Sequence, residues 1–85
     1  MTTNASSVSR ALRRAGFRPL PSGTSRGREG VRVSKALGHV TVTADIDRLG
    51  SAVELTDEMF QALVTRGYSV ERMSATRLWV TKEEA

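Results

Sequence analysis

The stretch Ala11–Phe17 reads ALRRAGF, and a related stretch, ALVTRGY, occupies Ala62–Tyr68. Each ends with a glycine followed by an aromatic residue. Because glycine adopts the left-handed conformation that ends a helix without a steric penalty, both stretches predict a helix end and a turn into extended backbone. The same helix-ending signal occurs twice, so we expect the chain to build two related units.

The residues before the first glycine predict an amphipathic helix. Its apolar residues recur at intervals of three and four and lie on one helical face: Val8, Ala11, Leu12 and Ala15. This spacing matches the period of 3.6 residues per turn. Ser6 or Ser7 is the expected N-cap, because a serine hydroxyl accepts a hydrogen bond from a free N–H of the first turn.

The second helix is expected to begin at Thr56 as its N-cap. Asp57 and Glu58 would then lie in the first turn, where the helix dipole favours negative charge. The apolar stripe of this helix consists of Met59, Phe60, Leu63 and Val64. The preceding residues, 46–55, contain Gly50 and Ser51 and are predicted to form a turn and an extended approach.

An extended segment and then a strand follow each glycine-aromatic pair. The second extended segment is 68–73, and its residues 68–71 alternate apolar and polar side chains, as a strand with one solvated face requires. Residues 17–20 contain Pro19, which has no N–H, so this segment is expected at a sheet edge or in irregular structure. The two closing strands, 31–35 and 78–82, both have apolar first and third residues and end in a hydroxyl residue and lysine.

Between the two units, residues 39–45 (HVTVTAD) alternate strictly and predict a strand that pairs with 31–35 through a turn at Gly38. The predicted order is αβββαββ. Two amphipathic helices would cover one face of an antiparallel sheet, which gives an α+β two-layer sandwich. We expect one domain at 8–82 with a pseudo-repeat (8–35 and 57–82), a flexible N-terminus at 1–7 and a C-terminal tail at 83–85.

The opening αβββα order resembles that of double-stranded-RNA-binding domains and of the small HicA-type toxins, in which the first helix also runs into a Gly-aromatic pair like Gly16-Phe17. The toxins carry a Gly-Ser-His motif on the next strand, where this chain has Gly23-Thr24-Ser25. The chain is also similar to short accessory proteins of actinobacterial phages, in which "GY-x-V" and a strand follow a helix, as at 62–70 and 78–80. That resemblance implies a viral protein.

Basic residues concentrate in the N-terminal part of the chain. Residues 1–35 carry eight basic and one acidic side chain, a net charge of +7, whereas residues 36–85 carry five basic and eight acidic side chains, a net charge of −3. Such a cluster attracts polyanions, and each phosphate that it neutralises releases counterions. The expected DNA- or RNA-binding residues are Arg10, Arg13, Arg14, Arg18, Arg26, Arg28 and Arg32. The alternatives are a solvated basic face and a surface for an acidic protein.

The sequence offers no set of residues suited to catalysis. His39 is the single histidine, and a Gly-x-Ser-x-Gly nucleophile motif is absent. Five acidic residues lie between 45 and 58, and two of them are better explained as first-turn residues of a helix than as Mg²⁺ ligands. The loop 23–30 lacks the Gly-Lys-Ser/Thr ending of a phosphate loop. The chain has no cysteine. We therefore expect no enzyme activity, cofactor, metal or small-molecule substrate.

Trp79 lies between Leu78 and Val80, so if those two residues face the core, the indole lies on the opposite face of the sheet. An exposed aromatic side chain there suits a protein interface or base stacking. The expected interface residues are Trp79, Arg32 and Arg77. Tyr68 is expected in the core with its hydroxyl at the rim.

Two functional hypotheses remain open. We favour a small non-catalytic protein-interaction module, such as a phage-encoded modulator of a host protein, that binds a protein partner or forms a homodimer. The reason is that aromatic and basic residues do not alternate in this chain as they do in many nucleic-acid-binding sequences. The alternative is a nucleic-acid-binding module that uses the N-terminal arginines. The N-terminus lacks a signal-peptide pattern and no apolar run approaches the roughly 20 residues of a membrane span, so we expect a cytoplasmic protein without membrane contact.

Overall fold

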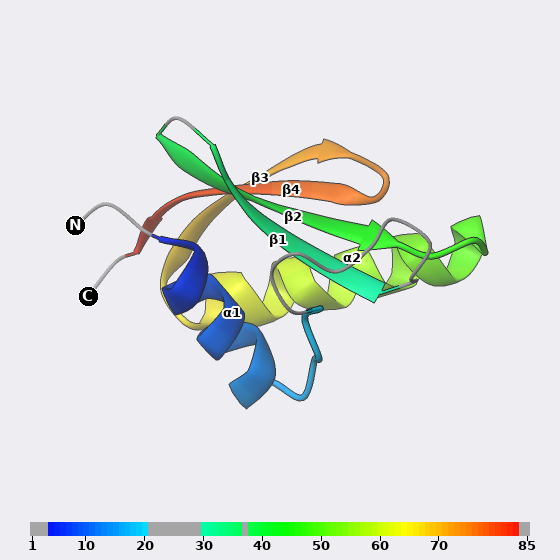
Figure 1. Cartoon of the computed structure of the whole chain (residues 1–85), viewed down its shortest axis with the longest axis horizontal. Coiled ribbons are helices and arrows are strands. Elements are labelled where there is room, and N and C mark those ends of the chain that lie inside the picture. The colour runs from blue at the N-terminus through cyan, green and yellow to red at the C-terminus, as the bar shows by residue number, and fades with distance from the viewer. Residues whose placement is uncertain (1–3, 21–29, 37, 84–85) are drawn as a thin grey trace.

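The computed structural model describes residues 4–20, 30–36 and 38–83 of the 85-residue chain. This part is an α+β protein with two helices and a four-stranded antiparallel sheet (Figure 1). The elements are α1 (Ala5–Arg14), β1 (Gly30–Ala36), β2 (His39–Asp45), α2 (Leu49–Thr65), β3 (Tyr68–Ser74) and β4 (Arg77–Glu83).

The sheet has the strand order β1-β2-β4-β3, and each neighbouring pair is antiparallel. The predicted hairpin between β1 and β2 is confirmed, with Gly38 in the connecting turn at a φ of 77°. Val42 lies opposite Val33 on one side and Leu78 on the other. Because residues opposite each other share a face of the sheet, this register gathers the alternating apolar residues of three strands on one face.

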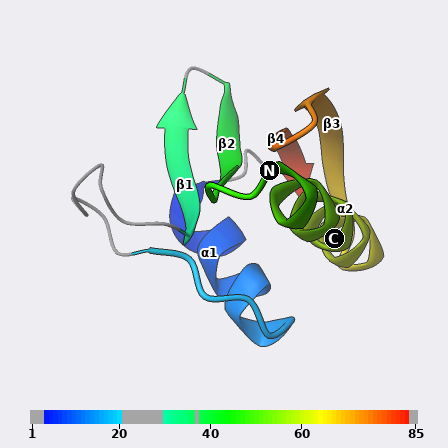
Figure 2. The ribbon, with the colours of Figure 1, turned by 90° about the vertical axis from the view of Figure 1, so that its right-hand side faces the viewer.

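The hydrophobic core lies between that face and the two helices. The sheet contributes five buried side chains to it from β2 and β4: Val40, Val42, Ala44, Leu78 and Val80. The expected stripe of α1 is confirmed for Val8, Ala11 and Leu12. Helix α1 contacts β1 and α2, and α2 contacts β2, β3 and β4. Both helices are seen below the strands in Figures 1 and 2.

Helix α1 begins one turn earlier than expected. The N-cap is Asn4, whose side-chain oxygen accepts a hydrogen bond from the Ser7 N–H at 2.8 Å, so the predicted cap at Ser6 or Ser7 is wrong. Asparagine caps a helix as well as serine does, and the earlier start packs Ala5 against the core. The helix therefore includes the last residues of the segment expected to be flexible.

Helix α2 begins at Leu49, not at Thr56, so the predicted turn and extended segment over 49–55 are wrong. The buried stripe of α2 is Ala52, Thr56, Met59 and Leu63, which extends the helical period back through the expected loop. Burial of Ala52 outweighs the weak helix propensity of Gly50 and Ser51. The Thr56 hydroxyl is fully buried and donates to the Ala52 carbonyl at 2.7 Å. Val64, expected in the stripe, is 44% exposed.

Residues 17–20 form irregular backbone beside the edge strand β1, one of the two alternatives that Pro19 predicted. A single parallel bridge joins Pro19 to Val31, and the Leu20 N–H donates to the Val31 carbonyl at 2.8 Å. The described residues therefore follow the order αββαββ instead of the expected αβββαββ.

The two closing strands with matching sequences occupy different places in the sheet. β1 lies at an edge, whereas β4 lies in the centre between β2 and β3. In each half of the described chain, a helix is followed by an edge strand and then by a central strand. By position in the sheet, β1 therefore corresponds to β3, and β2 corresponds to β4. The sequence match had paired β1 with β4.

Candidate anion-binding face

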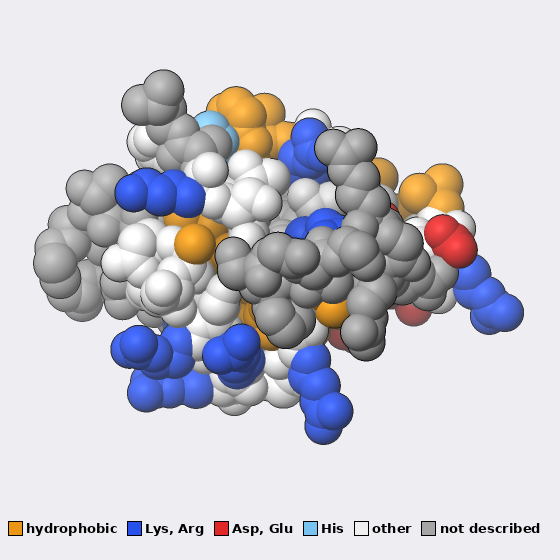
Figure 3. All heavy atoms as spheres, in the orientation of Figure 1, with side chains coloured by type: hydrophobic (Ala, Val, Ile, Leu, Met, Phe, Trp, Pro, Cys, Tyr) orange, Lys and Arg blue, Asp and Glu red, His pale blue; other side chains and the backbone are white. Residues whose placement is uncertain are grey.

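Four arginines of the predicted basic surface lie together on and just beyond α1. Arg10, Arg13 and Arg14 are exposed on the helix, and Arg18 is exposed after the turn at Gly16. The buried residues of α1 fix this orientation, because a helix that packs one side against the core directs the remaining side chains to solvent. Lys and Arg side chains gather over α1 along the lower edge of Figure 3.

A fifth arginine, Arg66, joins this group from α2. It is the exposed C-cap residue of that helix, and Gly67 follows it with a φ of 90°. In the two related stretches, Arg66 corresponds to Ala15, because each residue directly precedes the glycine. The sequence repeat therefore did not indicate a basic residue at this position. The basic face is defined here as Arg10, Arg13, Arg14, Arg18 and Arg66.

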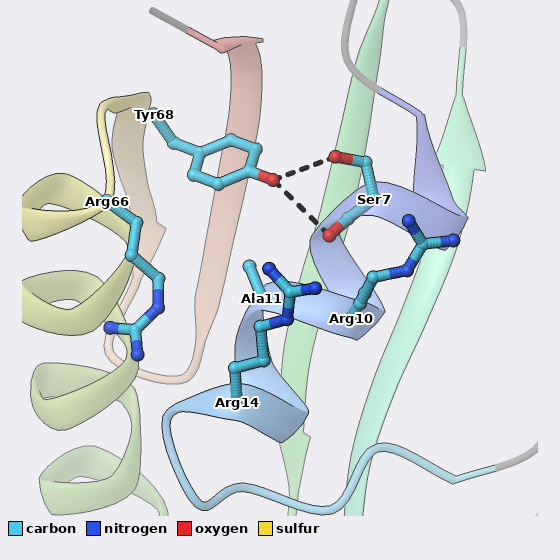
Figure 4. Close-up of a pocket in the computed structure, with 6 residues that line it drawn as sticks. All are labelled: Ser7, Arg10, Ala11, Arg14, Arg66 and Tyr68. Atoms are coloured by element: carbon cyan, nitrogen blue, oxygen red, sulfur yellow. Dashed lines mark hydrogen bonds between the residues drawn. The ribbon is translucent and has the colours of Figure 1, made fainter. Parts of the chain in front are cut away.

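A hollow of about 260 Å³ lies inside the basic face, between the two helices (Figure 4). The residues that line it are Ser7, Arg10, Ala11, Arg14, Arg66 and Tyr68. Arg10 and Arg14 are one helical turn apart on α1, whereas Arg66 and Tyr68 come from the end of α2 and the start of β3. Tertiary packing therefore brings residues separated by about fifty positions to one site.

A hydrogen-bonded contact between Tyr68 and Ser7 fixes one wall of this hollow. The Tyr68 hydroxyl lies 2.8 Å from the Ser7 hydroxyl and donates to the Ser7 carbonyl at 3.3 Å. The tyrosine is 7% exposed, which confirms the expectation of a core ring with its hydroxyl at the rim. The contact ties the first turn of α1 to the start of β3.

The described side chains include no acidic partner of the basic face. Their ion pairs are Arg32 with Asp45 and Arg72 with Asp57, and residues 4–20 contain no aspartate or glutamate. The C-terminal ends of α1 and α2 each contribute roughly half a negative charge through the helix dipole. Five full positive charges exceed these two partial ones, so the face remains electropositive.

Two further hollows lie along α1, and the larger one is also lined by Leu20 and by Val33 of β1. One of about 430 Å³ includes Arg10 and Arg13, and another of about 400 Å³ includes Arg13 and Arg18. Neighbouring hollows thus share an arginine. Arginine side chains and hollows therefore alternate along α1. Such an arrangement suits an extended ligand with repeated negative charges.

The remaining sequence candidates lie elsewhere. Arg32, Arg77 and Trp79 are on the face of the sheet opposite the core, as expected for Trp79: Arg32 and Arg77 both lie opposite Thr43, and Trp79 lies opposite Thr41. We call this surface the outer sheet face. The structure therefore separates Arg32 from the arginines of α1. The candidates Arg26 and Arg28 lie outside the described residues.

An aromatic stack lies on the outer sheet face, near the end of β2 that adjoins the turn at Gly38. The rings of His39 and Trp79 have centroids 4.1 Å apart and an interplanar angle of 26°. Toward the other end of β2, the Arg32 guanidinium donates to the Asp45 carboxylate at 2.8 Å. The side chains of His39 and Trp79 are both half-buried, so part of each ring remains accessible.

The described part of the chain contains no group of three His, Asp or Glu side chains placed to hold a metal ion. Within that part, neither helix is long and apolar enough to span a membrane. Comparison of the chain with protein-family models, curated proteins and solved structures found no match.

Proposed function

We propose that the protein is a nucleic-acid-binding module that contacts the phosphate backbone through the basic face. The observation that carries this proposal is the group of five exposed arginines, none of which forms an ion pair with a side chain that the structure describes. Exposed arginines that have no carboxylate neighbour keep their donors available, and the planar guanidinium binds phosphate oxygens through two parallel hydrogen bonds.

The spacing of the face favours a polyanion with regularly repeated charges over an acidic protein surface. Arg10 and Arg14 are four residues apart on one helix, a rise of about 6 Å. The hollows between successive arginines leave room for backbone groups that lie between phosphates. An acidic protein would present carboxylates at irregular distances on a surface that must also fit these hollows.

Fluorescence anisotropy with random-sequence DNA and RNA oligonucleotides tests the proposal. If the five arginines neutralise about five phosphates, raising salt from 50 to 200 mM should weaken duplex binding by about 10²- to 10³-fold. The absence of binding to all oligonucleotides at 50 mM salt would contradict the proposal.

Two double variants distinguish binding by the basic face from a general effect of net charge on affinity. Arg13→Gln/Arg18→Gln removes two charges from the basic face, whereas Arg48→Gln/Arg77→Gln removes two exposed charges elsewhere. The first pair should reduce the slope of log affinity against log salt by about 2, and the second pair should change it little. Equal losses, or a greater loss in the second pair, would show that the basic face is not the binding surface.

We also propose a second function, self-association through the outer sheet face of a two-layer sandwich, because the His39–Trp79 stack lies there. Charges of both signs are near this stack: Glu71 lies opposite Trp79, and Arg77 lies two residues before it on the same strand. A two-fold pairing could place Arg77 of one copy against Glu71 of the other and bury both stacks. Sedimentation equilibrium should then show a dimer that Trp79→Ala dissociates. A monomeric mass at high micromolar concentration would refute self-association.

A further inference from the structure

We propose that the hollow between α1, the end of α2 and the start of β3 binds a phosphomonoester group, that is, a terminal phosphate rather than a bridging one. The group would come from the end of a nucleic-acid strand or from a free mononucleotide. The strand-end source rests on the proposed function, whereas the phosphomonoester chemistry rests on this hollow alone.

The three arginines that line the hollow come from two helices. Figure 4 shows Arg10 and Arg14 bordering the gap from α1 while Arg66 extends along its other side from α2. None of the three forms an ion pair with another side chain that the structure describes. Three guanidinium groups supply many N–H donors within a small space, more than one phosphodiester with its two free oxygens can accept.

The charge balance favours a doubly charged ligand. Three positive charges around one hollow repel one another, so an anion that enters it gains from each of them. A phosphomonoester carries about −1.5 to −2 at neutral pH and has three terminal oxygens. A phosphodiester within a strand carries a single charge, so it neutralises less of this cluster.

The size of the hollow is suited to one such group. Its volume of about 260 Å³ lies below the about 300–1,000 Å³ typical of sites that enclose a whole drug-sized ligand. The attached sugar and base would therefore remain outside. Arg10 also lines the neighbouring hollow of about 430 Å³, which gives the attached nucleotide a path along the basic face.

One wall of the site is held in place before a ligand arrives. The Tyr68–Ser7 hydrogen bonds join α1 to β3, and the left-handed Gly67 turns the chain between Arg66 and Tyr68 so that both side chains line the same hollow. Tyr68 is therefore a positioning residue. A fixed wall lowers the ordering cost of binding.

Two matched ligand pairs test the inference. Anisotropy compares a 3′-labelled single strand carrying a 5′-phosphate with the same strand carrying a 5′-hydroxyl, and calorimetry compares adenosine monophosphate with adenosine. We expect the phosphorylated member of each pair to bind at least about tenfold more tightly, because charge-assisted hydrogen bonds form only with it.

Substitution of Arg66 assigns this preference to the hollow. Arg66→Gln should bring both affinity ratios close to one, and Arg14→Gln should lower them similarly. The control Arg13→Gln removes the same charge from outside the hollow, so it should weaken both strands together and keep the ratio. A preference that survives in both Arg66→Gln and Arg14→Gln would overturn the inference.

The same experiment separates the inference from the proposed function. Oligonucleotides that bind without preference for the 5′-phosphate, together with equal affinity for adenosine monophosphate and adenosine, would overturn the phosphate site and leave nucleic-acid binding intact. Binding of adenosine monophosphate over adenosine without binding of any oligonucleotide would support the site and remove the nucleic-acid function. A preference seen with strands but absent with the mononucleotides would identify the strand end as the source.

Discussion

Removing the Tyr68 hydroxyl with Tyr68→Phe tests whether the contact with Ser7 holds α1 against the rest of the fold. The substitution keeps the ring, which is 7% exposed, and deletes one oxygen atom. That atom lies 2.8 Å from the Ser7 hydroxyl and 3.3 Å from the Ser7 carbonyl. Because the ring stays in place, the change in stability reports the hydrogen bonds and little of the packing.

The expected cost follows from the partial burial of the contact. A protein hydrogen bond contributes about 0.5–1.5 kcal/mol net, and a buried group left without a partner costs more. Ser7 is half-buried, so water can replace the lost partner and the cost should stay near 1 kcal/mol. For a domain of this size, about 1 kcal/mol lowers the melting temperature by about 4–8 °C.

A double-mutant cycle with Ser7→Ala isolates the side-chain part of the contact. Urea denaturation of the four proteins gives each free energy of unfolding by linear extrapolation. Alanine raises helix propensity by up to about 0.7 kcal/mol, which offsets part of the loss in Ser7→Ala and cancels in the cycle. We expect a coupling energy of about 0.5–1 kcal/mol.

Two results would refute this reasoning. A coupling energy indistinguishable from zero would mean that the two hydroxyls do not interact in solution. A loss above about 3 kcal/mol in Tyr68→Phe alone would mean that the ring moves and that packing, not hydrogen bonding, is measured.

Three further substitutions test the fold, each measured by urea denaturation. Asn4→Ala removes the N-cap of α1 and should cost about 1 kcal/mol, whereas no loss would place the helix start elsewhere. Leu12→Ala leaves a cavity at a fully buried position and should lower the free energy of unfolding by about 2.7–5 kcal/mol. The exposed control Leu49→Ala should change it by no more than about 0.5 kcal/mol, and similar losses in both variants would contradict the burial of Leu12 in the core. Gly67→Ala forces a side chain into the left-handed region and should cost about 1–2 kcal/mol, so a neutral effect would argue against the turn.

The sequence correctly indicated those elements whose signals are local. Alternation placed β2 and β4, and the terminating glycines placed the ends of both helices. The exposed arginines of α1 also followed from its periodicity, because the buried stripe of a helix leaves the opposite side in solvent. These features depend on neighbours a few residues away.

Local sequence signals mispredicted where both helices begin, because more than one start residue was compatible with the local sequence. Gly50 and Ser51 are weak helix formers, yet α2 runs through them because Ala52 is buried at the core. At α1, two serines and one asparagine could each cap the helix, and packing of the first turn selected Asn4. Propensity differences of about 1 kcal/mol or less are smaller than the gain from burying another turn of helix.

The amino-acid sequence alone determined an α+β chain with its positive charge concentrated near the first helix. Tertiary structure alone decided that Arg66 joins Arg10 and Arg14 around one hollow, and that Arg32 faces away on the outer sheet face. The reason is physical. Helix and strand periods arise from backbone geometry over a few residues, whereas the meeting of two helix ends depends on how distant apolar faces pack around a shared core.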